Sequence, residues 1–122
     1  MTTLIRDYTQ YMETARQRAQ ALGPRDAERH ARAWRAAYAA GALVKERYPD
    51  AKVYIFGSLL YADSFGEHSD IDLAVEGIPW PDYLRIWGEL ERREPEFEID
   101  LVDLGLVSAA MRAAIEREGK LL

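Results

Sequence analysis

The segment Ser69–Val75 (SDIDLAV) most constrains the fold, because apolar and acidic residues alternate along it. In a β-strand alternate side chains share a face, so Ile71 and Leu73 would point one way and Asp70 and Asp72 the other. The strand would therefore carry two neighbouring carboxylates on one side of a mostly apolar segment. Such carboxylates repel each other in a poorly solvated place, and a divalent cation removes that conflict.

A second segment, Phe97–Leu104 (FEIDLVDL), repeats the Ile-Asp-Leu pattern. If Ile99 and Leu101 enter the core, Asp100 faces outward, and Asp103 lies on the opposite face unless the strand has ended. Three carboxylates in a chain with no Cys and two His suit a hard cation such as magnesium, completed by water and substrate phosphates. Two such ions form the usual clamp for in-line phosphoryl displacement.

A third signal is the short apolar run Val53–Phe56, which ends in Gly57 and Ser58 and predicts a strand entering a tight turn. Gly57 would let the backbone approach a ligand closely, and Ser58 would offer a hydroxyl and an N–H to a phosphate. Residues 59–62 are expected to start a helix whose N-terminal dipole also favours an anion. Most Gly-Ser pairs are ordinary turns, so this motif gains its weight from the aspartates that follow.

In this order, the Gly-Ser pair, Asp70 with Asp72, and the later Asp100 resemble the minimal nucleotidyltransferases, small relatives of the DNA polymerase beta superfamily. The resemblance covers roughly residues 43–122. The chain departs from the family in two places: eleven residues (59–69) precede the first aspartate, one more than is usual, and no small-Arg-Gly sequence follows Gly-Ser. The extra residue can sit in the loop 64–68 without moving either strand, and the missing small-Arg-Gly sequence affects the local phosphate or substrate contacts more than the metal site.

The resemblance implies an enzyme that transfers AMP from ATP to an acceptor hydroxyl. Asp70, Asp72 and Asp100 would be catalytic and would bind two Mg²⁺ ions, and Asp100 would also help to deprotonate the attacking oxygen. The nucleotide-binding residues would be Gly57, Ser58 and Ser69. Members of this family often act as antitoxins of HEPN toxins, and some adenylylate a toxin tyrosine. A HEPN-type toxin is therefore the leading expectation for a protein partner.

Three alternatives stay open at this point. The first is transfer to a small molecule such as an aminoglycoside, where a dimer would supply the wall that a second domain usually provides. The second is an antitoxin that neutralises its toxin by contact alone, against which the complete set of three aspartates argues. The third is that these are surface acids at strand ends, which requires two Ile-Asp-Leu segments and an upstream Gly-Ser to coincide.

Composition limits the remaining possibilities. The chain of 122 residues, 48% apolar and 30% charged, fits a single domain. Its net charge of −5 argues against nucleic-acid binding, which depends on basic surfaces. The absence of Cys fits a reducing compartment, the N-terminus shows no apolar signal region, and the longest uncharged apolar run, Ala36–Val44, is too short to span a membrane. We therefore expect a cytoplasmic protein.

Apolar spacing predicts four helices, over Leu4–Leu22, Pro24–Tyr48, Asp82–Glu94 and Leu106–Glu118. Together with three strands they predict an α/β fold with helices on one face of the sheet and an open carboxylate face as the active site. The resemblance to the minimal nucleotidyltransferases implies in addition that this sheet of about three strands is small and mixed. The first helix (residues 1–23) would be an addition to the nucleotidyltransferase domain at 24–122, forming a hairpin with the second and helping to dock a protein partner or a second copy.

Three further residues lie in the second and third predicted helices: Arg25, His30 and Leu84. Arg25 and His30 match the Arg-x4-His signature of HEPN ribonucleases, but a solvated helix face is the better interpretation of that segment. In the third helix, Leu84 is expected to point inward.

Overall fold

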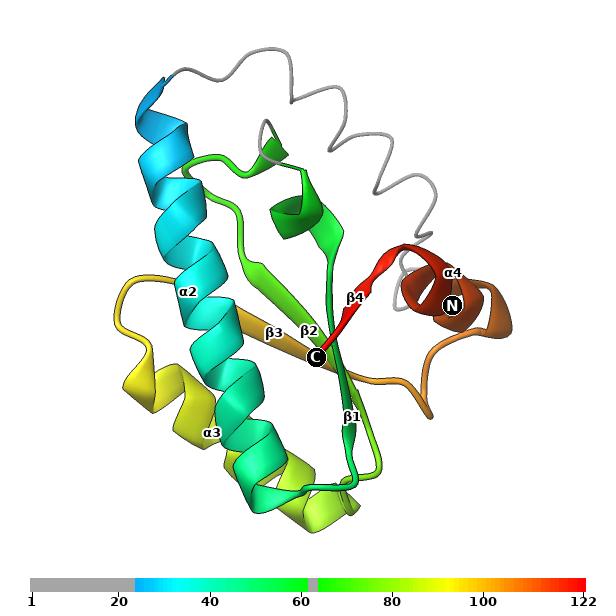
Figure 1. Cartoon of the computed structure of the whole chain (residues 1–122). Helices are drawn as coiled ribbons and strands as arrows, with labels where there is room; N and C mark the ends of the chain where they lie inside the picture. Colours follow the sequence, from blue (N-terminus) through cyan, green and yellow to red (C-terminus); the bar gives the residue numbers. More distant parts are fainter. Residues whose placement is uncertain (1–23, 62–63) are drawn as a thin grey trace.

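A computed structural model describes residues 24–61 and 64–122. The elements in order are α2 (Pro24–Arg47), β1 (Lys52–Phe56), a 3₁₀ turn (Gly57–Leu60), β2 (Ile71–Glu76), α3 (Trp80–Arg93), β3 (Ile99–Asp103), α4 (Ala109–Glu118) and β4 (Lys120–Leu121). The α/β fold with a small mixed sheet is confirmed (Figure 1). The predicted helix Leu4–Leu22 lies outside the described residues. Among the helices that are described, none is both long and apolar enough to cross a membrane.

The sheet contains four strands in the order β3-β2-β1-β4. β1 is antiparallel to both β2 and β4, whereas β2 and β3 are parallel. The parallel pair requires a crossover connection, and α3 supplies it. The fourth strand was not expected, because its two residues are too short to show an alternating pattern; it forms by pairing with Tyr54 and Ile55 of β1.

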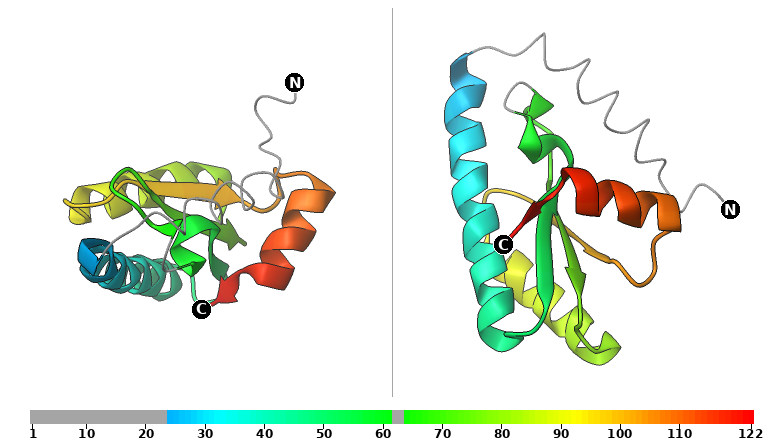
Figure 2. Two further views of the ribbon diagram at one scale, coloured as in Figure 1. Left: turned by 90° about the horizontal axis from the view of Figure 1, so that it is seen from above. Right: turned by 45° about the vertical axis from the view of Figure 1, so that its right-hand side comes forward.

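One face of the sheet packs against α2 and α3. The strands present residues such as Ile55, Leu73 and Leu101 to this face, each at most 1% exposed. On α2 the contact is made largely by small residues, including Ala33 and Ala37, which let the helix lie close to the strands. Figure 2 shows the two helices on the same side of the sheet. Each fully buried Leu or Ile contributes roughly 1.5–3 kcal/mol, so this layer is the main source of stability.

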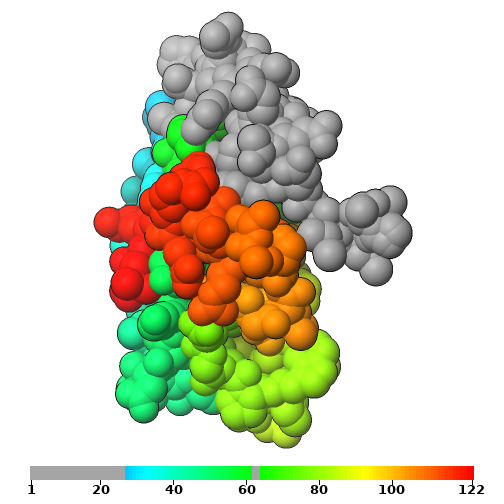
Figure 3. Space-filling model, turned by 90° about the vertical axis from the view of Figure 1, so that its right-hand side faces the viewer, coloured from blue at the N-terminus to red at the C-terminus, as the bar shows by residue number. Residues whose placement is uncertain are grey.

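The opposite face is only partly open. A second apolar cluster joins Tyr54, Phe56 and Ala74 of the strands to Ala114 and Ile115 of α4. The expectation of an uncovered carboxylate face is therefore wrong for the part of the sheet beneath α4. Figure 3 shows this side of the molecule, where α4 and the segment before it (orange to red) occupy the middle.

Two helix starts and one side-chain orientation differ from the prediction. α3 starts at Trp80 rather than Asp82, because Pro81 is well tolerated in a first turn. Leu84 is 57% exposed and not inward, since Tyr83 and Ile86 take the buried positions. α4 starts at Ala109 because the hydroxyl of Ser108 accepts a hydrogen bond from the Met111 N–H at 3.1 Å and caps the helix there.

The outer edge of β3 is occupied by side chains of α3. Glu98 directs its carbonyl toward β2, where it accepts from the Ile71 N–H at 2.9 Å, so the carbonyls of Ile99 and Leu101 point to the free edge. Trp87 donates its indole N–H to the Ile99 carbonyl at 2.8 Å, and the Tyr83 hydroxyl donates to the Leu101 carbonyl. These two bonds fix α3 against the last strand of the sheet.

Candidate functional site

The strand directions bring the predicted site residues to one edge of the sheet. β1 runs toward this edge and ends at Phe56, whereas the parallel strands β2 and β3 start from it. In the register, Phe56 pairs with Asp72, and Asp72 pairs with Asp100. Adjacent strands lie roughly 4.8 Å apart, so the Asp72 and Asp100 side chains leave the same face as neighbours. Asp70 directly precedes β2 at the same edge.

The three aspartates differ in exposure. Asp72 is 4% exposed, and Asp70 and Asp100 are half-buried. Two carboxylates brought side by side in so poorly solvated a place repel each other, which favours a cation or cationic ligand between them. The prediction that Asp72 and Asp100 meet on one face is thus consistent with the register of β2 and β3.

The aspartates suit magnesium because their donor atoms are carboxylate oxygens. Within residues 24–61 and 64–122, no three His, Cys, Asp or Glu side chains come close enough together to hold a metal ion by themselves. Magnesium is, however, commonly bound through one or two carboxylates and completed by water and substrate phosphates. The all-oxygen donor set of Asp72 and Asp100 suits that mode, in which the nucleotide would bring the remaining ligands.

The segment after β1 is a single 3₁₀ turn, called the Gly-Ser turn below (Gly57–Leu60). Gly57 has φ +80°, a conformation that residues with a Cβ rarely adopt, so the glycine is required by the backbone here. The turn ends as the Tyr61 N–H donates to the Ser58 carbonyl at 3.1 Å. The α-helix expected to start at residues 59–62 is absent from the part of this segment that the structure describes, which removes the argument from a helix dipole.

Of the predicted nucleotide contacts, Ser58 is buried and Ser69 is half-buried. Ser58 is 6% exposed, at the start of the Gly-Ser turn. The Ser69 hydroxyl accepts a hydrogen bond from the Gly66 N–H at 2.9 Å and lies 3.5 Å from the Ser64 carbonyl oxygen. The Ser69 hydroxyl is therefore engaged with the backbone of its own loop, 64–69, in this structure. Its contact with a nucleotide stays a prediction.

Two further ionisable groups lie near Asp100: the carboxylate of Asp103 and the hydroxyl of Tyr83. Asp103 ends β3, and its carboxylate accepts from the Gly105 N–H at 2.8 Å, so it shapes the following turn and does not extend the carboxylate row. Burial, together with the carboxylates of Asp103 and Asp100, raises the pKa of the Tyr83 hydroxyl to about 12.

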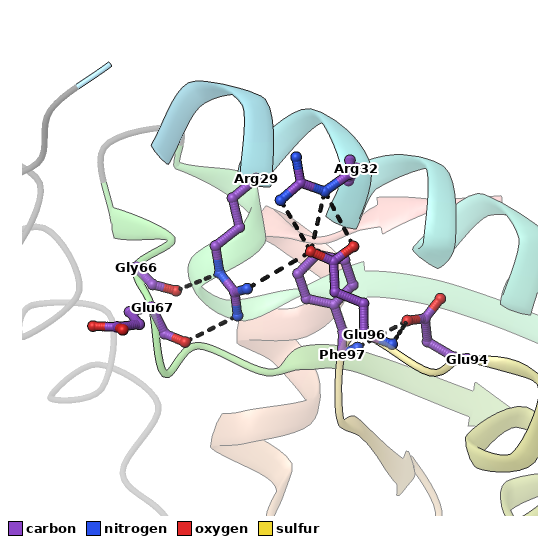
Figure 4. Close-up of polar contacts among 7 residues, drawn as sticks. All are labelled: Arg29, Arg32, Gly66, Glu67, Glu94, Glu96 and Phe97. Carbon is purple, nitrogen blue, oxygen red and sulfur yellow. Dashed lines mark hydrogen bonds and ion pairs between the residues drawn. The ribbon is translucent and has the colours of Figure 1, made fainter. Parts of the chain in front are cut away.

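The first turns of α2 contact the loops around the aspartates, which the sequence pattern did not predict. Arg29 and His30 are half-buried, although this stretch was interpreted as a solvated helix face. His30 Nε2 lies 2.6 Å from the Leu59 carbonyl oxygen in the Gly-Ser turn. Arg29 contacts the loop that precedes Asp70 (Figure 4). No pattern within α2 could have revealed this, because the partners are backbone carbonyls some 29 to 38 positions away.

A surface hollow of about 400 Å³ lies elsewhere, between the C-terminal end of α2 and α3. Its lining includes Arg47 and Glu89, which form an ion pair at 2.6 Å. It includes none of the predicted site residues, so we leave it out of the site.

Comparison with known proteins agrees with the fold. The family model described as "Polymerase beta, Nucleotidyltransferase" matches residues 43–122. A chain in the crystal structure of the toxin–antitoxin pair MntA–HepT superposes with a TM-score of 0.52 and 22% identity, covering 70% of this chain and 68% of that one. A mutant of the toxin–antitoxin pair named MntA–HpeT gives a TM-score of 0.56 and 21% identity, covering 70% of each chain. A search of curated protein sequences found no match.

The family match spans the Gly-Ser turn and all three aspartates, and it coincides with the range over which the motif resemblance was observed. The two structural matches have low identity and therefore support the fold. This chain belongs to the polymerase beta nucleotidyltransferase family.

Proposed function

We propose that this protein transfers AMP from ATP to an acceptor hydroxyl, and that the acceptor is a tyrosine of a HEPN-type toxin. The observation that carries the proposal is the pairing of Asp72 with Asp100 at the edge where β1 enters the Gly-Ser turn. Family membership supports nucleotidyl transfer. The structural similarity to a toxin–antitoxin pair supports the choice of partner.

In this proposal Asp70, Asp72 and Asp100 hold two Mg²⁺ ions together with the nucleotide phosphates. Bound magnesium would neutralise phosphate charge and favour the ionised form of the attacking hydroxyl. The acceptor oxygen forms a bond to the α-phosphorus, the bond to the β-phosphate breaks, and pyrophosphate leaves. Asp100 receives the hydroxyl proton in this proposal, since it is half-buried and so more accessible to an acceptor than Asp72, which is 4% exposed.

The similar structures offer further support for the aspartate pair. The MntA–HpeT variant carries two Asp-to-Glu replacements, two positions apart in the chain. This is the spacing of Asp70 and Asp72. A Glu keeps the charge but places it one methylene further from the backbone, so such a variant perturbs the kind of site proposed here.

The proposal also covers the class of acceptor, the cellular compartment and the oligomeric state. An acidic chain with a net charge of −5 is better suited to a protein acceptor than to a nucleic acid. The absence of Cys from the sequence fits a reducing compartment, and we place the activity in the cytoplasm, where ATP and magnesium are available. A second copy of the chain is an alternative partner for a site at an open sheet edge.

The test is to incubate the purified chain with a HEPN toxin, Mg²⁺ and each labelled nucleotide, and to follow the intact mass of both proteins. We expect the toxin to gain one AMP with ATP, and to gain none in EDTA or with Asp72→Asn. Tight toxin binding without transfer from any nucleotide would contradict the enzyme and favour the non-catalytic antitoxin. Light scattering of the same sample reports the oligomeric state.

A further inference from the structure

Arg29 of α2 contacts the loop that leads into β2. Its Nε donates to the Gly66 carbonyl at 3.1 Å, and its Nη2 donates to the Glu67 carbonyl at 3.0 Å. Its side chain is 21% exposed, so these bonds are partly shielded from water. Gly66 and Glu67 precede Asp70 by four and three positions. The guanidinium therefore holds the backbone just before the first aspartate.

The same guanidinium also contacts the loop that leads into β3. Its central carbon lies 4.7 Å from the centre of the Phe97 ring, and Nη1 lies 4.0 Å from a carboxylate oxygen of Glu96. Phe97 precedes Asp100 by three positions. Figure 4 shows Arg29 between the two loops, with the Gly66 and Glu67 carbonyls on one side and Glu96 and Phe97 on the other.

The two loops are joined directly where the strands begin, because the Ile71 N–H donates to the Glu98 carbonyl at 2.9 Å. A shift of one loop against the other would therefore change the register at the start of β2 and β3. That register sets how Asp72 and Asp100 face each other. The guanidinium of Arg presents its donors in a rigid planar fork and stacks on ring faces, whereas the ammonium of Lys is a compact point charge on a flexible stem, so Lys would not hold the two loops in the same geometry.

We propose that Arg29 is a positioning residue for the carboxylate site: it clamps the two loops so that Asp70 and Asp72 on one strand and Asp100 on the other bind one metal–nucleotide complex. The inference rests on the proposed function and goes further by assigning the control of site geometry to α2. His30 extends the same arrangement to the Gly-Ser turn through its contact with the Leu59 carbonyl.

The chain contains a matched control one helical turn away. Arg32 binds both carboxylate oxygens of Glu96 at 3.1 Å through Nε, and its hydrogen bonds within the described residues all go to Glu96. Its side chain is 43% exposed. Arg32 therefore resembles Arg29 in type, helix and acidic partner, but it contacts one loop and Arg29 contacts two.

The experiment compares Arg29→Lys with Arg32→Lys in the full chain, by measuring the Mg²⁺ concentration that gives half-maximal ATP binding. Loss of a group that orients metal ligands typically weakens metal affinity by roughly 10- to 100-fold. We expect the Mg²⁺ midpoint of Arg29→Lys to rise by about tenfold or more, with excess Mg²⁺ restoring binding. Arg32→Lys should stay within about twofold of the parent chain.

A second measurement is independent of the nucleotide. Hydrogen exchange at the Ile71 and Ser69 amides reports the junction of the two loops, and it should be faster in Arg29→Lys but unchanged in Arg32→Lys. A lower melting temperature for Arg29→Lys with an unchanged Mg²⁺ midpoint would make the residue merely structural and overturn the proposal. Should Arg29→Lys not fold, Arg29→Gln provides the same two measurements without the positive charge.

The two proposals fail in different ways. If the parent chain binds Mg²⁺ and ATP but transfers nothing, the transfer reaction is wrong, and the Mg²⁺ midpoint still decides the role of Arg29. If the parent chain transfers AMP and Arg29→Lys matches Arg32→Lys in both measurements, the positioning role alone is wrong. A parent chain that binds no Mg²⁺ with ATP overturns both.

Discussion

The two faces of the sheet are built from the same strands but end in different environments. On the face toward α2 and α3 the buried residues continue along the strands, with Ile71 and Leu73 both 0% exposed. On the other face the character changes within two positions: Ala74 belongs to the apolar cluster under α4, and Asp72 starts the carboxylate row. Because side chains alternate along a strand, one segment supplies both the core and the site.

This difference teaches that the site depends on register as much as on residue type. A slip of one position would bury the aspartates against α2 and expose the core residues, so the packing of the first face protects the geometry of the second. Arg29 contacts the loop before Asp70 and His30 contacts the Gly-Ser turn, at the end of the sheet where the aspartates lie. A substitution on the carboxylate face should therefore lower activity, and a substitution on the face toward α2 and α3 should lower the free energy of unfolding.

The largest effect is expected from Asp72→Asn, on the carboxylate face. It removes one charge of the pair with Asp100 while keeping shape, so AMP transfer should fall by roughly 10²-fold or more, the scale seen when a preorganised charged group is lost. Initial rates at saturating ATP and Mg²⁺ check this, and circular dichroism shows whether the fold is kept. Equal rates in Mg²⁺ and in EDTA for the parent chain would contradict the underlying metal dependence.

The counterpart on the other face is Leu73→Ala, the next residue along β2. It leaves a cavity against α2 and α3, and a substitution of this kind costs about 2–5 kcal/mol in the free energy of unfolding. Urea denaturation measures it. The folded fraction should keep its turnover per molecule, so an activity loss larger than the loss of folded protein would show that the two faces are not separable.

A smaller effect is expected from Ser58→Ala in the Gly-Ser turn. The change deletes one hydroxyl and keeps the backbone N–H, so KM for ATP should rise by about two- to tenfold, the scale of one ordinary hydrogen bond of about 0.5–1.5 kcal/mol, while kcat changes less. Calorimetric titration with ATP provides the check. An unchanged affinity would move the phosphate contacts away from this turn.

The smallest effect concerns Tyr83, which is 6% exposed at the edge of the apolar face. Its pKa of about 12 lies above the ordinary value near 10, so the unfolded chain ionises first and stability should fall as pH rises from about 10 to 12. Tyr83→Phe should lose about 1 kcal/mol at pH 7 and show a shallower fall above pH 10. Denaturation series at several pH values test it; parallel curves for both chains would refute the assignment.

Much of this fold could be predicted because its signals are local. Alternation identified β2 and β3, and the helix prediction over Pro24–Tyr48 ends one residue beyond α2. The same alternation predicted that Asp72 and Asp100 share a face, which agrees with the register of β2 and β3, whereas the catalytic role of the aspartates stays a prediction. Their shared edge then follows from a parallel β2–β3 pair, which the resemblance implied as a mixed sheet.

The parts that escaped prediction depend on distant partners. β4 has two residues and exists by pairing with β1, more than 60 positions earlier in the chain. α4 packs on the carboxylate face, although its own apolar spacing cannot say which face it covers. Arg29 is an ordinary charged residue in its helix, and its role arises from carbonyl groups in a loop beyond β1.

The bonds from Tyr83 and Trp87 to β3 have a consequence for how this protein can meet other chains. An exposed strand edge offers unpaired carbonyls on which a foreign strand can add, and such addition is a common route to aggregation. Here the Ile99 and Leu101 carbonyls are already occupied by α3, and the opposite edge is a strand of two residues. Extension of the sheet by a foreign strand is therefore disfavoured at both edges, and we expect a partner to bind through side-chain surfaces.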